Sequence, residues 1–361
     1  METQETRRIQ SPGGIGIAFE VMSPAQDGVA PFSLRRSILY SLIICLGFFG
    51  SAEVLLRIAG VRPPVNPRIL LRAMDSDIRL PFMGPDPEVF WSPTPNWRGD
   101  FLDRPVTINA LGLRGAEVRR PKPPGSRRVV CLGDSITFGF GVGDEETYPY
   151  HLGADLGVDV VNAGVTGFTS HQVLGFVRRL LPVLDPDVVT ICIGWNDGNG
   201  RPADDREYAR RLRMIMSVEG PLDHVYIYKA VKSLYVRAFA RRVTAPGGAE
   251  PRGPRVTLTQ YRENLEEIVR ACRARGVRPV FLGLPRRKRS GETLPDPVYA
   301  HVFAEIARAL DVPLLDSGDL GVDMTVPSNE QYFIDGLHFS PSGSDLMARQ
   351  IARQLVALGI L

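Results

Sequence analysis

A serine follows directly at the end of an apolar stretch of the chain. Residues 129–133 are mostly apolar and partly β-branched, and Asp134 and Ser135 come next, before a glycine-punctuated turn. This pattern is typical of a buried strand that delivers a side chain to the edge of a sheet, where a serine is a candidate nucleophile. Asp and Ser are also preferred helix N-caps. The stretch alone therefore favours a cap, and a nucleophile needs support from the rest of the chain.

Later strand-like runs are followed by groups of complementary chemistry. Gly164 lies in a turn that can expose backbone N–H groups, Asn196 follows the third run, and Asp335 and His338 follow the fifth. Sites in open parallel sheets form beyond the carboxyl ends of the strands, so these groups are expected to meet near Ser135. Each of them alone has a plainer explanation as a turn or cap residue. Their joint occurrence favours a site.

These residue types are the ones that serine-based acyl transfer requires. A serine hydroxyl is a weak nucleophile until a base takes its proton, and histidine titrates near neutral pH, so His338 is the candidate base. The imidazole needs a group that fixes its tautomer, and Asp335 lies three residues earlier. The oxyanion formed on attack needs prearranged donors, which backbone N–H groups and the Asn196 amide can supply.

Nothing in the composition indicates a metal, a cofactor or a nucleic acid. The 361 residues include 43 basic and 40 acidic ones, and the net charge of +3 is too small to suggest nucleic-acid binding. No cluster of His, Cys and carboxylates has metal-ligand spacing, so we expect neither a metal nor another cofactor. The other histidines and the cysteines are interpreted as packing or surface residues: His151, His171, His224, His301, Cys45, Cys131, Cys192 and Cys272.

After residue 127 the chain alternates between strand-like and helical patterns, which predicts a parallel sheet covered by helices on both faces. Short buried strands are expected at 128–132, 158–162, 187–193, 278–284 and 312–316. Helices are expected at 145–156, 170–184, 258–276, 297–310 and 341–358. Residues 198–256 exceed what a crossover needs and are interpreted as an insertion with a helical, basic segment at 225–242. We favour a lid for the insertion as a whole and a solvated helical face for its charges, with a membrane or polyanion surface as the alternative.

Residues 35–58 are predicted to be a transmembrane anchor. Residues 37–52 carry no charge, and a helix that continues to Leu56 reaches about 30 Å, enough to cross a hydrocarbon core. A cleaved signal peptide and a buried core helix are the alternatives. Arginines lie on both sides of the span, so the positive-inside count does not fix its orientation.

The remaining boundaries follow from composition. Residues 1–34 are polar and rich in Gly and Pro and are predicted to be a disordered tail. Residues 59–126 are Pro-rich but contain aromatic residues, which argues against a free linker. We interpret this stretch as a mostly irregular segment packed on the catalytic domain, which occupies residues 127–361.

Four short blocks, in order, resemble those of the SGNH/GDSL hydrolases. They are Gly133-Asp134-Ser135, Gly164, Gly194-Trp195-Asn196-Asp197 and Asp335-Gly336-Leu337-His338. The resemblance implies a flavodoxin-like three-layer α/β/α fold with a catalytic triad of Ser135, His338 and Asp335. It also implies an oxyanion hole made by the N–H of Ser135, the N–H of Gly164 and the side-chain amide of Asn196. The element from Asn109 to Gly115 is similar to one in membrane-anchored bacterial members, whose catalytic domain faces the periplasm or cell surface.

The sequence therefore predicts a single-pass membrane protein with a serine esterase domain outside the cytoplasm. Its substrate would be an acyl or O-acetyl ester carried by a small molecule, a lipid or a cell-envelope glycan. Two alternatives stay open: an O-acetyltransferase acting on a cell-surface polysaccharide, which would use the same residues with a sugar acceptor, and a catalytically silent binding or assembly module. The sequence indicates no oligomeric state.

Overall fold

The computed structural model describes residues 33–60, 80–201, 203–216, 224–244, 253–283, 297–315, 327–335 and 337–361. Most of the predicted disordered tail lies outside these residues. The chain divides into two units, residues 1–55 and 56–361, which we describe separately.

The N-terminal unit contains most of helix α1 (Leu34–Ile58), which coincides with the predicted anchor. None of its 25 residues is buried, and its mean hydropathy reaches 2.0. A helix of this length extends about 38 Å, more than the hydrocarbon thickness of a bilayer. By length and composition α1 is a candidate membrane span, and a signal sequence would meet the same criteria.

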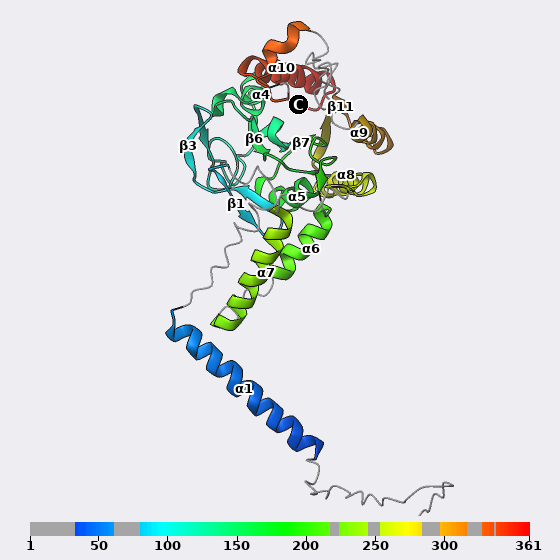
Figure 1. The fold of residues 1–361 in the computed structure, drawn as a ribbon. Helices are drawn as coiled ribbons and strands as arrows, with labels where there is room; N and C mark the ends of the chain where they lie inside the picture. Colours follow the sequence, from blue (N-terminus) through cyan, green and yellow to red (C-terminus); the bar gives the residue numbers. More distant parts are fainter. Residues whose placement is uncertain are drawn as a thin grey trace, which may run out of the picture. The chain divides into compact units, whose positions relative to one another are not determined.

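A five-stranded parallel sheet lies at the centre of the second unit and confirms the predicted fold class (Figure 1). The strand order is β11-β10-β7-β5-β6. The strands are β5 (Arg128–Gly133), β6 (Asp159–Gly164), β7 (Val188–Cys192), β10 (Arg278–Leu282) and β11 (Leu314–Leu315). Strand β5, which leads to Ser135, is therefore flanked by β6 and β7.

Helices cover both faces of the sheet and form two separate apolar cores. Val129 and Cys131 of β5 face the core that contains α4 and α10, whereas Val130 and Leu132 face the core that contains α5, α8 and α9. This alternation is the period of two expected of a strand buried on both faces. The helices are α3 (Ser135–Phe138), α4 (Tyr148–Leu156), α5 (Ser170–Leu184), α8 (Leu258–Arg273), α9 (Pro297–Ala309) and α10 (Pro341–Ala357), with 3₁₀ turns at Asp144–Glu146 and Pro327–Tyr332.

Helix starts follow from local capping chemistry. Thr257 and Gln260 form a capping box at the start of α8, and Thr169 and Gln172 form one at the start of α5. Ser340 caps α10, and its hydroxyl accepts a hydrogen bond from the N–H of Gly343. These caps fix where each helix leaves the edge of the sheet.

The segment before the sheet is more regular than the sequence suggested. It forms two antiparallel hairpins, β1 (Met83–Asp86) with β2 (Phe90–Pro93) and β3 (Arg98–Phe101) with β4 (Arg104–Thr107). Its aromatic side chains join the core beside α5: Phe82, Phe90 and Trp91 are fully buried. The ring of Phe82 stacks on that of Phe138 in α3, with centroids 5.1 Å apart. Residues 80–126 therefore pack as part of the same hydrophobic core.

The two ends of the insertion at residues 198–256 lie next to each other, beside the segment that follows β7. It contains β8 (Gly200–Arg201), α6 (Asp205–Met216), α7 (Tyr226–Thr244) and β9 (Gly253–Pro254), and β8 pairs with β9. The N–H of Val256 donates to the carbonyl of Asp197 at 3.0 Å, and the N–H of Arg255 donates to that of Asn199 at 2.9 Å. Both ends of the insertion are thus tied to the segment that follows β7.

Phe82→Ala tests whether residues 80–126 belong to the folding unit. The substitution removes a buried ring that contacts Phe138, Trp97 and Phe101. We expect it to lower the free energy of unfolding by about 3–5 kcal/mol, measured by denaturant unfolding of the full chain in detergent. Tyr150→Ala removes a ring that is 49% exposed and is the control, with a change within about 0.5 kcal/mol. Equal effects of the two variants would contradict an integrated segment.

Candidate active site

Three of the residues singled out in the sequence lie within hydrogen-bonding distance of one another. Ser135 follows β5 at the start of α3, and its Oγ lies 2.8 Å from Nε2 of His338. The Nδ1 of His338 lies 2.7 Å from Oδ2 of Asp335. The His338 side chain is 14% exposed and that of Asp335 is 48% exposed, so the site opens to solvent on the carboxylate side. The order serine, imidazole, carboxylate is the one that activates a serine nucleophile.

Asp335 is fixed by its own backbone neighbourhood. Its Oδ1 accepts hydrogen bonds from the N–H of Leu337 at 3.0 Å and from the N–H of His338 at 2.9 Å. Partial burial acts to raise the pKa of Asp335, but the hydrogen bonds from the side chain and backbone of His338 outweigh it and hold that pKa below its usual range. The carboxylate therefore stays ionised and keeps the imidazole oriented.

An aromatic pair packs against the imidazole. The ring centroid of Phe140 lies 4.6 Å from that of His338, and Phe101 contacts Phe140 edge-on with centroids 5.2 Å apart. Phe140 follows the short helix that begins at Ser135, and Phe101 belongs to β3. These contacts limit the orientations open to His338. Neither ring stands out in the sequence, because each occupies an ordinary apolar position outside the short motifs.

The structure separates the two interpretations of the Gly133-Asp134-Ser135 stretch. Asp134 is the N-cap of α3: its Oδ1 accepts the N–H of Ile136 at 3.0 Å, and the residue is fully buried. The Ser135 hydroxyl is left to face His338. A Cβ at Gly133 would lie 2.2 Å from Oγ1 of Thr137, so close packing requires glycine there. The three residues have three different tasks.

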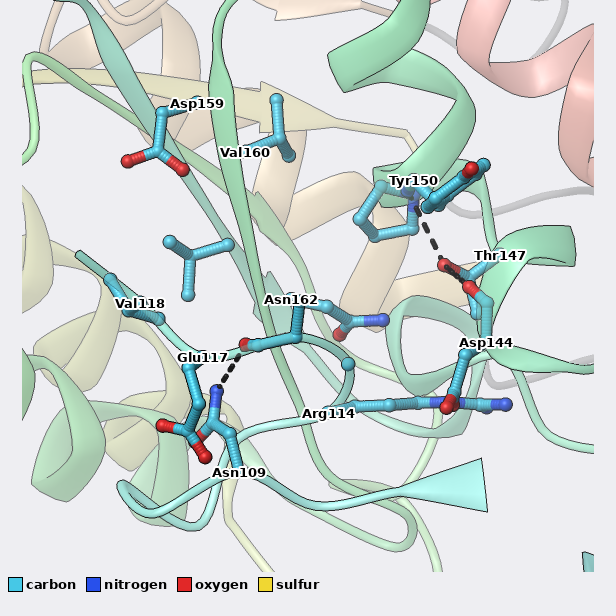
Figure 2. A pocket seen from close by; sticks show the side chains of 14 residues that line it. Asn109, Arg114, Glu117, Val118, Asp144, Thr147, Tyr150, Asp159, Val160 and Asn162 are labelled. Carbon is cyan, nitrogen blue, oxygen red and sulfur yellow. Dashed lines mark hydrogen bonds and ion pairs between the residues drawn. The ribbon is translucent and has the colours of Figure 1, made fainter. Parts of the chain in front are cut away.

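Arg114 fixes the chain that leaves α3. Its guanidinium donates to the carbonyls of Phe138 at 2.7 Å, Gly139 at 2.5 Å and Val142 at 2.5 Å. It also pairs with Asp144 at 3.1 Å, and Figure 2 shows the two side chains next to each other. Arg114 is 4% exposed. The element at residues 109–115 therefore acts on the segment that carries the serine.

Gly164 has a packing role and an occupied N–H. A Cβ there would lie 2.2 Å from the backbone nitrogen of Phe138, so only glycine lets β6 approach α3 this closely. Its N–H donates to Oδ1 of Asn162 at 3.0 Å, and the Asn162 amide donates to the Phe138 carbonyl at 3.3 Å. To serve an oxyanion, Gly164 would have to give up this bond.

Asn196 contacts the turn that follows β6. Its Nδ2 donates to the carbonyl of Phe168 at 3.0 Å, which occupies one of its two amide hydrogens. Gly167, in the same turn, has a φ of +75°, a conformation that favours glycine. Within the described residues, no hydrogen-bond acceptor lies against the N–H of Gly167 or of Ser135. The sequence signal for Gly167 was present, because this turn contains two glycines.

One known family matches the part of the chain that contains the central sheet. The model of the GDSL-like lipase/acylhydrolase family matches residues 131–346, from within β5 to within α10. The chain belongs to this family. Among the described residues, no three or more His, Cys, Asp or Glu side chains gather in an arrangement that could hold a metal ion.

Solved structures of the same kind are similar at low identity. One is the lipase/acylhydrolase from Enterococcus faecalis, with 20% identity, a TM-score of 0.42 and coverage of 64% of this chain and 96% of that one. Another is the psychrotrophic esterase EstA from Pseudoalteromonas sp., with 15% identity, a TM-score of 0.41 and coverage of 65% and 100%. Among curated protein sequences no significant match is found.

Asp335→Asn gives a pH-dependent test of the site. Because the folded-state pKa of Asp335 is lowered, its ionised form stabilises the fold above the unfolded-state pKa of about 3.9. That contribution is lost as the pH falls below this value. We expect the stability difference between wild type and Asp335→Asn to shrink as the pH is lowered from 6 to 3, measured by urea unfolding. Asp155→Asn, at an exposed position of α4, is the control. A difference that stayed constant would contradict the ionic role of Asp335.

Proposed function

We propose that the protein is a serine esterase in which Ser135, His338 and Asp335 form the catalytic triad. The observation that carries the proposal is the unbroken hydrogen-bonded series from Ser135 Oγ through both nitrogens of His338 to Asp335. Membership of the GDSL-like lipase/acylhydrolase family supports ester bonds as the target. Nε2 of His338 lies within hydrogen-bonding distance of the Ser135 hydroxyl, the reach that a general base needs.

The proposed reaction has two steps, acylation of Ser135 and deacylation by water. Nε2 of His338 takes the proton of Ser135 while Oγ attacks the ester carbonyl, and Asp335 stabilises the imidazolium. Collapse of the tetrahedral intermediate expels the alcohol, which takes the proton from His338 and leaves an acyl-enzyme. Water then attacks the acyl carbon with His338 as base, and the acid is released. A sugar hydroxyl in place of water would turn the same second half into acyl transfer.

Three donors are proposed for the oxyanion. The N–H of Ser135 and the second amide hydrogen of Asn196 have no acceptor among the described residues. We propose the N–H of Gly167, rather than that of Gly164, as the third donor, because Gly164 already donates to Asn162. Donors arranged before the reaction stabilise the transition state without reorganisation.

An apolar rim beside the imidazole supports an acyl ester. A Cβ at Gly141 would lie 3.0 Å from Cδ1 of Ile334 and 3.9 Å from Cδ1 of Leu102, so the two side chains flank the loop after Phe140. Ile334 is 50% exposed and Leu102 is 57% exposed. They offer an apolar surface next to Phe140, on which an acyl group of the substrate can lie. Helix α1 is proposed to anchor the esterase domain outside the cytoplasm, facing esters of lipids or envelope glycans.

Ser135→Ala tests the nucleophile. We expect the variant to keep its unfolding temperature and to lose turnover of acyl esters, because no hydroxyl remains to form the acyl-enzyme. The measurement is a hydrolysis screen over esters of increasing acyl length and over acetylated glycans, with and without a sugar acceptor. Ser342→Ala removes a hydroxyl at the start of α10 and is the control. Activity retained in Ser135→Ala would refute the assignment.

Asn196→Ala tests the oxyanion donor. Loss of one such donor should lower kcat by about 10²–10³, with little change in KM, because the interaction strengthens only in the transition state. Asp155→Ala, at an exposed position of α4, is the control and should leave kcat unchanged. A rise in KM alone would make Asn196 a substrate-binding residue.

A further inference from the structure

Three consecutive carbonyl groups of the turn after β6 are held by three separate parts of the chain. The carbonyl of Thr166 accepts a hydrogen bond from the indole Nε1 of Trp91 at 3.0 Å. The carbonyl of Gly167 accepts one from Nη1 of Arg255 at 2.7 Å. The carbonyl of Phe168 accepts one from Asn196, as described above. Trp91 lies in the N-terminal hairpin and Arg255 at the end of the insertion, so neither belongs to the strand ends that form the triad.

Both donors are themselves fixed. Trp91 is fully buried and Arg255 is 2% exposed. The guanidinium of Arg255 also donates to Oε1 of Gln172 at 2.7 Å and pairs with Asp205 at 3.2 Å. It lies over the ring of Trp91, 5.4 Å from the centroid. A buried charge with this many partners has no low-cost alternative arrangement, because releasing it would leave charges unpaired in the core.

Holding a carbonyl fixes the N–H of the next residue. A trans peptide is planar, and its N–H points away from its C=O. The bond from Trp91 to the Thr166 carbonyl therefore sets the direction of the Gly167 N–H, the proposed oxyanion donor. The carbonyl of Gly167, held by Arg255, belongs to the peptide whose N–H donates from Phe168 to Val165 at 3.2 Å and closes the turn. Both bonds constrain the same short loop.

We propose that Trp91 and Arg255 are positioning residues that aim the Gly167 N–H at the oxyanion. This inference rests on the proposed esterase function. It gives the β1–β2 hairpin a role in the catalytic rate, although this hairpin lies outside the residues matched by the family model. It also explains why the insertion is tied back beside Asp197: the insertion ends in the residue that holds the turn.

Trp91→Phe is the direct test, because it keeps a buried aromatic ring and removes the five-membered ring that carries the indole N–H. In the full chain we expect kcat to fall roughly tenfold to a hundredfold, with KM within about twofold. The fall should not exceed that expected when an oxyanion donor is removed altogether. Trp97→Phe is the matched control from the same segment: among the described residues its indole N–H has no acceptor, and its ring packs on Phe82 at 5.5 Å. Its kcat should stay unchanged.

Arg255→Lys tests the hydrogen bond from Arg255 to the Gly167 carbonyl. It keeps the inference testable if Trp91→Phe does not fold. Lysine keeps the charge beside Asp205 but cannot hold Gly167, Gln172 and Asp205 together. We expect a fall in kcat without a matching rise in KM. The fall in kcat caused by Trp91→Phe or Arg255→Lys should not add to that caused by Asn196→Ala, because Trp91, Arg255 and Asn196 all act on the same oxyanion.

The outcomes separate this inference from the function it rests on. Suppose that turnover requires Ser135 but that Trp91→Phe, Trp97→Phe and Arg255→Lys all keep the wild-type kcat. The positioning role is then wrong, and the esterase assignment stands. If turnover survives Ser135→Ala, the esterase assignment fails and the positioning role fails with it. If Trp91→Phe has a lower unfolding temperature but an unchanged kcat, Trp91 is a purely structural residue.

Discussion

The hydrogen bond between Ser135 and His338 joins residues that are 203 positions apart, and the rest of the structure serves to make it possible. It requires the end of a central strand and a loop near the C-terminus to meet within 2.8 Å. Each partner is held from its own side. Ser135 is placed by the cap at Asp134 and by the close packing at Gly133, and His338 is placed by Asp335 and by the ring of Phe140. The bond therefore depends on two separate placements: that of α3, which packs on β5 and β6, and that of the loop before α10, which carries His338.

A second theme is the use of buried cations to hold backbone carbonyls. Arg114 holds three carbonyls of the chain leaving α3, and Arg255 holds one in the turn after β6. A short loop has few side chains of its own with which to fix its peptides, so donors from elsewhere in the chain supply the constraint. Both arginines are buried and both are paired with a carboxylate, Asp144 or Asp205, which offsets the cost of removing the charge from water. In this way segments outside the sheet fix the loops at its edge.

The sequence predicted the sheet and the proximity of Ser135, His338 and Asp335 because both follow from periodic signals and from one topological rule. Five apolar runs separated by amphipathic helices define a parallel sheet, and its carboxyl edge gathers whatever polar residues follow the strands. Ser135, Asp335 and His338 were found in this way. The hairpins at 83–107 were not, because their four-residue strands are rich in Pro, Gly and charge and lack a clear alternation. Trp91 and Arg255 were not found either, since a buried contact to a carbonyl leaves no trace in residue spacing.

Covalent labelling tests the central claim most directly. A fluorophosphonate reacts with a serine only when its hydroxyl is activated and the phosphoryl oxygen is stabilised, so it reports on the whole site at once. The full chain, treated with the reagent and digested, should carry one phosphonate on the peptide containing Ser135, and Asp335→Asn should slow the labelling. Labelling at another serine, or none under conditions in which the fold is intact, would contradict a triad of Ser135, His338 and Asp335.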